Sequence, residues 1–129
     1  MRIHMSAAVL IAAFSFVYGL TSAEYAILFL TIGFVMVSEM LNTATEVVIN
    51  LEMPSYHRLA KIGKDISAGA VFISALTSIV VGLCLFLHFP KLYDTLLKIV
   101  TTPYLAIVFV LLVIVGIIFS FGFKIKSKG

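Results

Sequence analysis

Apolar residues gather in four long stretches, separated by short segments that are polar or contain proline. The stretches cover residues 5–20, 25–51, 57–89 and 104–123; the third begins with polar residues and becomes apolar near Ile66. A helix needs about 20 apolar residues to cross a hydrocarbon core of about 30 Å, so each stretch can cross, the first one barely. The pattern predicts an all-α, polytopic membrane protein, built as one small helical bundle.

The separating segments carry residues that start or end helices. Residues 21–24 offer capping side chains before the second stretch. Pro54 and Pro90 end the helices of the second and third stretches, and Pro103 lies near the first turn of the fourth. Residues 91–100 are amphipathic, which predicts a short helix lying along the membrane interface.

Composition supports the membrane interpretation. Of the 129 residues, 62% are hydrophobic and 12% are charged, whereas soluble domains are about half apolar and about a quarter charged. A soluble enzyme is therefore excluded. The single cysteine, Cys84, rules out an internal disulfide. The net charge of +3 is small, and membrane topology explains the lysines near helix ends better than a nucleic-acid partner does.

The basic residues predict the orientation. They favour one side of the membrane, which places both termini and the loop 52–65 in the cytoplasm. A cleavable signal peptide is the alternative for the first stretch, but cleavage would leave an odd number of spans and move the basic loop outward, so we favour a true first span. The cytoplasmic set is Arg2, Arg58, Lys61, Lys64, Lys124, Lys126 and Lys128, against Lys91 and Lys98 on the other side.

A polar stripe interrupts the second stretch. Its spacing of three, four and seven residues puts its members on one helix face. An ionisable group within a span costs about 2.5–3.5 kcal/mol on insertion scales, so it usually faces a bundle interior or a polar cavity. A helix-packing patch would explain the amide and the threonine alone, whereas two acids beside them favour a functional site. The stripe consists of Glu39, Asn42, Thr43, Glu46 and Asn50.

A second polar block, residues 55–70, opens the third stretch from the same side. The positive-inside rule explains its lysines, but it leaves Asp65 unexplained, because this acid lies where the apolar run begins. The small residues 68–70 permit close approach of another helix. The positions that share one face are His57, Lys61, Lys64, Asp65 and Ala68; His57 alone would be an interfacial residue.

Together the two blocks predict a cytoplasmic pocket with carboxylates and ammonium groups. Carboxylates can hold Mg²⁺ together with phosphate oxygens and water, and lysines neutralise phosphate charge. Phosphoryl transfer depends mainly on positioning and electrostatics, so carboxylates and lysines in one pocket are the types of group that it needs. A carboxylate deeper in the membrane could accept a proton from a lipid hydroxyl.

At these residues the chain resembles the small integral-membrane diacylglycerol kinase and undecaprenol kinase family of bacteria. The resemblance is carried by "E-x-L-N-T-A-x-E" at residues 39–46 and "Y-H-x-L-A-K-x-x-K-D-x-x-A-G-A-V" at residues 56–71, and it covers about residues 1–82. It implies a homotrimer of three-span subunits with composite sites at subunit boundaries, to which this chain adds a fourth, C-terminal span.

The resemblance also implies roles for individual residues. Glu39 is expected to be the general base for the lipid hydroxyl, and Glu46 the Mg²⁺ ligand. Asn42, with Thr43 and Ala68, is expected to order the site and the substrate. The implied ATP-binding set is Glu46, Ser55, Tyr56, His57, Lys64 and Asp65.

The chain departs from the family pattern at three points. Asn50 stands where the family usually has Asp. The family usually places an amphipathic surface helix with a metal-binding acid just before the stretch that matches residues 1–4, so we expect residues 1–129 alone to be weak or inactive as a kinase. The expected organisation is a kinase-like domain at 1–89, an interfacial connector at 90–102, and an extra span with a basic cytoplasmic tail at 103–129.

These observations predict an ATP- and Mg²⁺-dependent lipid kinase of the bacterial plasma membrane. The sequence "YHRLAKIGKD" resembles the undecaprenol-using branch, so undecaprenol is preferred over diacylglycerol as the acceptor. A four-span proton-coupled exporter would account for the spans and Glu39, but not for Glu46, Lys64 and Asp65 at one cytoplasmic level. A third possibility is a catalytically weak or inactive subunit derived from the kinase.

Overall fold

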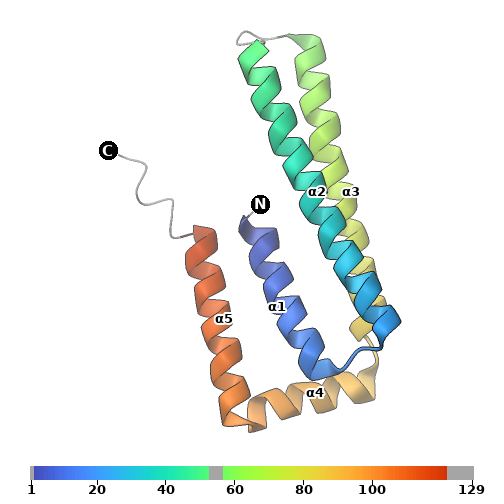
Figure 1. The fold of residues 1–129 in the computed structure, drawn as a ribbon, viewed down its shortest axis with the longest axis vertical. Helices are drawn as coiled ribbons and strands as arrows, with labels where there is room; N and C mark the ends of the chain where they lie inside the picture. The colour runs from blue at the N-terminus through green and yellow to red at the C-terminus, as the bar shows by residue number, and fades with distance from the viewer. Residues whose placement is uncertain (1, 53–56, 122–129) are drawn as a thin grey trace. The chain divides into compact units, whose positions relative to one another are not determined.

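The computed structural model describes residues 2–52 and 57–121, and every regular element within them is a helix (Figure 1). This confirms the all-α prediction. The helices follow the apolar stretches closely, and each begins or ends near the polar or proline residues that separate them. They are α1 (Arg2–Tyr18), α2 (Ser22–Glu52), α3 (Arg58–Phe86), α4 (Phe89–Thr101) and α5 (Pro103–Phe121).

Three of the helices, α2, α3 and α5, are long and apolar enough to cross a membrane. With 31 residues, α2 is about 46 Å long and exceeds a hydrocarbon core of about 30 Å. Its polar last turns can therefore stand beyond the apolar layer. The first helix has 17 residues, a length of about 25 Å; it is shorter than the three candidate spans, and its crossing of the membrane stays a prediction.

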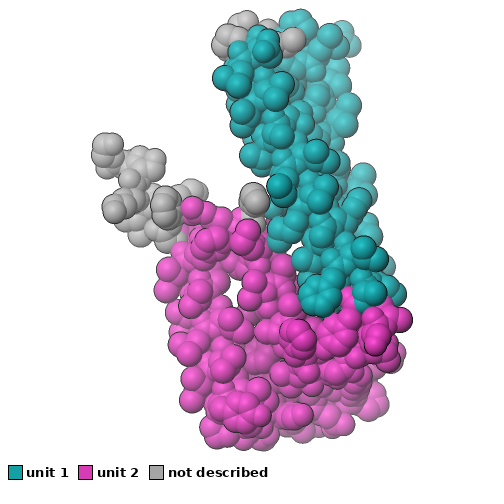
Figure 2. Space-filling model, in the orientation of Figure 1, with its two compact units in different colours: residues 1, 26–84 teal, residues 2–25, 85–129 magenta. Residues whose placement is uncertain are grey.

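The chain divides into two compact units, which Figure 2 shows in different colours. The first unit contains residues 26–84, that is, most of α2 and α3. The second contains residues 2–25 together with residues 85–129, which include α1, α4 and α5.

The first unit is an antiparallel helix hairpin, in which polar side chains of α2 and α3 meet. Leu28 and Val35 are buried on the inner face of α2, and Ile49 follows on the same seven-residue spacing. A Cβ atom on Gly63 would lie 3.2 Å from Ile49 Cδ1, so the two helices come close at this glycine. Gly69, by contrast, faces open space within the single chain, although the sequence pattern marks residues 68–70 as suited to helix contact.

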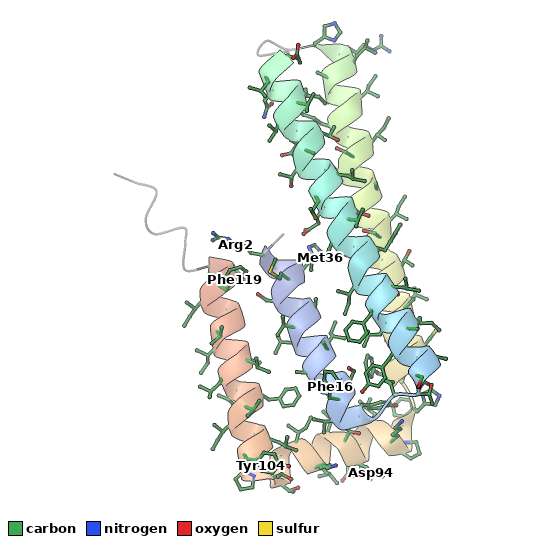
Figure 3. The ribbon with its side chains drawn as sticks, in the orientation of Figure 1. Arg2, Phe16, Met36, Asp94, Tyr104 and Phe119 are labelled. Carbon is green, nitrogen blue, oxygen red and sulfur yellow. The ribbon has the colours of Figure 1, made fainter. Side chains whose placement is uncertain are left out.

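In the second unit, α1 packs against α5 through small residues. Ser6 Oγ lies 3.3 Å from the carbonyl oxygen of Gly116 and 3.2 Å from Ser120 Oγ. Small residues four apart on a helix let two backbones approach closely in membranes. At one end of this pair the Arg2 guanidinium stands 5.5 Å from the centre of the Phe119 ring (Figure 3).

Helix α4 packs against both α1 and α5. The Lys91 ammonium donates to the carbonyl oxygen of Gly19, at 2.8 Å, and lies 4.4 Å from the Tyr18 ring centre. Thr95 is buried, whereas Phe89 and Tyr93 are exposed on the apolar side of the helix. The predicted amphipathic helix is therefore present, and its place along a membrane interface stays a prediction.

Candidate functional site

The polar stripe of α2 begins with a buried acid. The side chain of Glu39 is only 7% exposed, and its neighbour Ser38 is buried with it. Thr43 Oγ1 donates to the backbone carbonyl oxygen of Glu39, at 2.9 Å, so the threonine hydroxyl is used within its own helix. Glu39 is thus a buried acid within a candidate membrane span, a costly placement that is typical of functional sites.

A hydrogen-bonded group lies one turn further along α2. Ser67 Oγ, from α3, donates to Asn42 Oδ1 across the hairpin, at 2.7 Å. The Asn42 amide nitrogen in turn donates to Glu46 Oε1, at 3.4 Å. Glu46 itself is exposed. The group therefore connects an inner part of the hairpin to an acid on its surface.

A second cross-helix bond joins the two polar blocks nearer the loop. The Lys64 ammonium donates to Asn50 Oδ1, at 2.6 Å. The acceptor is a neutral amide, so the bond holds the lysine side chain without cancelling its charge. This places a cation beside the exposed end of the polar stripe.

The register of the hairpin brings the two predicted blocks to one level. Asn42 pairs with Ser67, and Ile49 lies against Gly63. In an antiparallel pair each step forward on α2 is a step back on α3, so Glu46 lies level with residues 63–66, which include Lys64 and Asp65. Glu39 lies about 10 Å from Glu46 along the helix, a rise of seven residues.

His57 occupies the start of α3. Its ring Nδ1 accepts a hydrogen bond from the backbone amide of Leu59, at 3.3 Å, and its carbonyl oxygen accepts one from the amide of Lys61, at 3.1 Å. The bond from Leu59 satisfies an amide of the first turn that has no partner within the helix, and the bond from Lys61 is the first helical backbone bond. His57 therefore caps the start of α3 through its Nδ1, and its Nε2 stays available to a further partner.

The remaining predicted site residues fall into two groups. Asp65 and Ala68 are exposed on α3. Ser55 and Tyr56 lie outside the described residues. The single chain therefore brings together Asn42, Glu46, Lys64 and Asn50, and it leaves Asp65 and Ala68 on an open face.

The donor set fits a magnesium ion that arrives with a nucleotide. Among the residues that the structure describes, no group of three or more His, Cys, Asp or Glu side chains could hold a metal ion. Mg²⁺ usually takes one or two protein carboxylates and completes its shell with phosphate oxygens and water. The exposed carboxylate of Glu46, steadied by Asn42, suits that shared type of site.

The sequence reasoning missed Ser67, and it did not foresee the bond between Asn50 and Lys64. A signal for Ser67 was present, because it lies three residues after Lys64 and so on the same face of α3. Gly63 was missed as well, since its importance depends on the Ile49 side chain opposite it.

The sequence of the chain is similar to a known protein family and to two known proteins. The family model for prokaryotic diacylglycerol kinase matches residues 1–86. Over 87 residues the chain is 44% identical to a diacylglycerol kinase of Synechocystis sp., a match that covers 67% of this chain and 50% of that protein. Over 91 residues it is 41% identical to the undecaprenol kinase of Bacillus subtilis, covering 70% of this chain and 72% of that protein. The chain thus spans half the length of the first relative.

No solved structure matches the chain. The family match, however, extends over more than half of the sequence and contains both polar blocks, with Glu39, Glu46 and Lys64 among the matched residues. The chain therefore belongs to the prokaryotic diacylglycerol kinase family, a family of ATP-dependent lipid kinases.

Proposed function

We propose that this chain transfers the γ-phosphate of ATP to the hydroxyl group of a membrane lipid alcohol. The observation that carries the proposal is the separation of two kinds of polar group on one helix pair. A buried carboxylate, Glu39, lies within the apolar part, and an exposed group with Glu46 and Lys64 lies about 10 Å away. We assign the first to a lipid hydroxyl and the second to a nucleotide that arrives from water.

The exposed group is assigned to the nucleotide. Glu46 would hold Mg²⁺ together with phosphate oxygens, and the bound ion would neutralise charge on the phosphates. The Lys64 ammonium, held by Asn50, would face the phosphate chain. Ser55, Tyr56, His57 and Asp65 complete the proposed ATP-binding set, with His57 offering its Nε2.

Glu39 is assigned to the lipid hydroxyl. In the proposed step the hydroxyl oxygen forms a bond to the γ-phosphorus, the bond from that phosphorus to the ADP oxygen breaks, and the hydroxyl proton passes to the Glu39 carboxylate. Asn42, Thr43 and Ala68 are assigned to ordering the site. The hydrogen bonds of Asn42 to both helices support this assignment.

The proposed assembly is a homotrimer in the bacterial plasma membrane, with both termini in the cytoplasm. The exposed site residues Glu46 and Asp65 support a site completed by another subunit. The open surface at Gly69 offers room for a partner helix. Undecaprenol remains the preferred acceptor over diacylglycerol, on the sequence of residues 56–65.

Reconstitution in lipid vesicles tests the proposed function. The purified chain is mixed with Mg²⁺, ATP labelled in the γ-phosphate, and one lipid alcohol at a time, including undecaprenol and diacylglycerol. We expect label to move into the lipid, with more product from undecaprenol. ATP consumption that does not depend on the added lipid, or no ATP consumption at all, would contradict the proposal. Proton-driven export of a cation from the same vesicles would favour the exporter.

The contact between Asn50 and Lys64 yields a prediction for nucleotide affinity. Asn50→Ala should raise the KM for ATP about fivefold, since a hydrogen bond of this kind contributes about 1 kcal/mol. Asn50→Asp keeps an acceptor for the Lys64 ammonium and should stay within about twofold of the wild type, because exposed ion pairs contribute about 0–1 kcal/mol. Initial rates over a range of ATP concentrations give both values. An unchanged KM for ATP in Asn50→Ala would contradict the assignment of Lys64 to the nucleotide site.

A further inference from the structure

We propose that Ser67 is a positioning residue, which fixes the amide of Asn42 so that its NH₂ group faces the proposed metal ligand Glu46. The inference rests on the proposed function, because it gives Ser67 a role toward the metal-binding acid. No part of the sequence pattern assigned a role to Ser67. Its position follows from the register of the hairpin.

The geometry at Asn42 has one satisfied arrangement. Ser67 Oγ stands 2.7 Å from Asn42 Oδ1 and 3.0 Å from the carbonyl oxygen of Lys64, and we assign its single proton to the shorter contact, on the carbonyl side of the amide. The NH₂ side then faces Glu46 Oε1, at 3.4 Å. With the amide turned over, its oxygen would face the carboxylate, and two acceptors would oppose each other.

Removal of the Ser67 hydroxyl would leave the Asn42 oxygen without its bond across the hairpin. The amide could then rotate about its side-chain torsions, and Glu46 would lose a fixed donor. Glu46 is exposed, so little packing limits its own rotamers. Residues that orient a metal ligand typically change metal affinity by about 10- to 100-fold when they are removed.

Other serines of α3 show that the Ser67 bond is distinctive. The hydroxyls of Ser74 and Ser78 donate to carbonyl oxygens of their own helix, those of Val71 at 2.8 Å and Ala75 at 2.7 Å. Ser67 has the equivalent contact to the carbonyl oxygen of Lys64, at 3.0 Å, but its shorter bond crosses to α2. Ser78 is half-buried, as Ser67 is, and provides a matched control.

The sequence makes this arrangement directly observable. The chain has two asparagines, Asn42 and Asn50, and no glutamine. Labelling asparagine side chains with ¹⁵N therefore gives two NH₂ groups in an NMR spectrum of the full chain in detergent micelles, and Asn50→Ala identifies which is which. Both groups lie in the proposed site.

We expect Ser67→Ala to shift and broaden the Asn42 NH₂ signals and to leave those of Asn50 in place, whereas Ser78→Ala should change neither. In the vesicle assay Ser67→Ala should raise the Mg²⁺ concentration needed for half-maximal rate about tenfold. The KM for the lipid should stay the same in both variants. A merely structural serine would alter stability without this selective change.

Two results would overturn the inference, and they differ. If the wild type phosphorylates lipid, and Ser67→Ala matches Ser78→Ala in both the Asn42 signals and the Mg²⁺ requirement, Ser67 has no positioning role, and the proposed function stands. If the wild type neither phosphorylates lipid nor shifts either asparagine signal when Mg²⁺ and ATP are added, the proposed function fails, and the role of Ser67 fails with it.

Discussion

Glu39→Gln is expected to lower kcat about 100-fold or more while leaving the KM for ATP nearly unchanged. General-base catalysis contributes about 10²- to 10⁴-fold to a rate, and the amide cannot accept the hydroxyl proton. Glutamine has nearly the same volume and can still form hydrogen bonds, so this buried position should keep its packing. The loss should therefore fall on a transition-state interaction and not on nucleotide binding.

The control for this variant lies on the same helix. Glu52→Gln removes one negative charge from the exposed end of α2, at a residue without a proposed role, and should leave the kinetics unchanged. Thermal unfolding of both variants in micelles reports whether packing has suffered. If Glu39→Gln instead raises the KM for ATP strongly while kcat extrapolated to saturating ATP is retained, Glu39 belongs to the nucleotide site.

The helices could be predicted from the sequence to within a few residues. The stretch at 25–51 corresponds to α2 at Ser22–Glu52, and the amphipathic run at 91–100 lies within α4, Phe89–Thr101. Membrane helices must satisfy their backbone polar groups internally, so a long apolar run has few alternatives to a helix. Prolines and capping residues then set the ends.

The stripe on α2 was equally accessible, because helical spacing alone puts Glu39, Asn42 and Glu46 on one face. Their partners were not. Spacing shows which face of each helix is polar, but it does not give the register between two helices. The bonds from Ser67 to Asn42 and from Lys64 to Asn50 depend on that register. The same limit explains why Gly63 was overlooked in favour of residues 68–70.

Burial adds a physical difference between two acids to which the resemblance assigns different roles. Glu39 and Glu46 share a face and a residue type, yet the first is buried and the second exposed. Glu39 lies in the middle of α2, whereas Glu46 stands nearer the polar end of that helix. The division of roles between a lipid-side base and a nucleotide-side metal ligand gains its physical support from this difference.

Glu46→Gln is expected to reduce Mg²⁺-dependent lipid phosphorylation about 100-fold or more at ordinary Mg²⁺ concentrations, because a catalytic group displaced by about 1 Å can cost about that factor. The variant tests the charge of Glu46 alone, since the glutamine oxygen can still accept the hydrogen bond from the Asn42 amide. It therefore removes the charge of the acid and keeps its contact with the helix pair. Insertion into the membrane should not change, because Glu46 is exposed at the polar end of α2.

Rates measured over a wide range of Mg²⁺ concentrations distinguish a metal ligand from a residue that only shapes the site. Loss of a ligand should shift the Mg²⁺ dependence to higher concentrations, so that part of the activity returns when Mg²⁺ is raised. Glu52→Gln, on the same helix, should follow the wild-type curve. Full activity of Glu46→Gln at ordinary Mg²⁺ would show that Glu46 is not a metal ligand. A reduced rate with an unshifted Mg²⁺ curve would assign Glu46 to positioning the nucleotide.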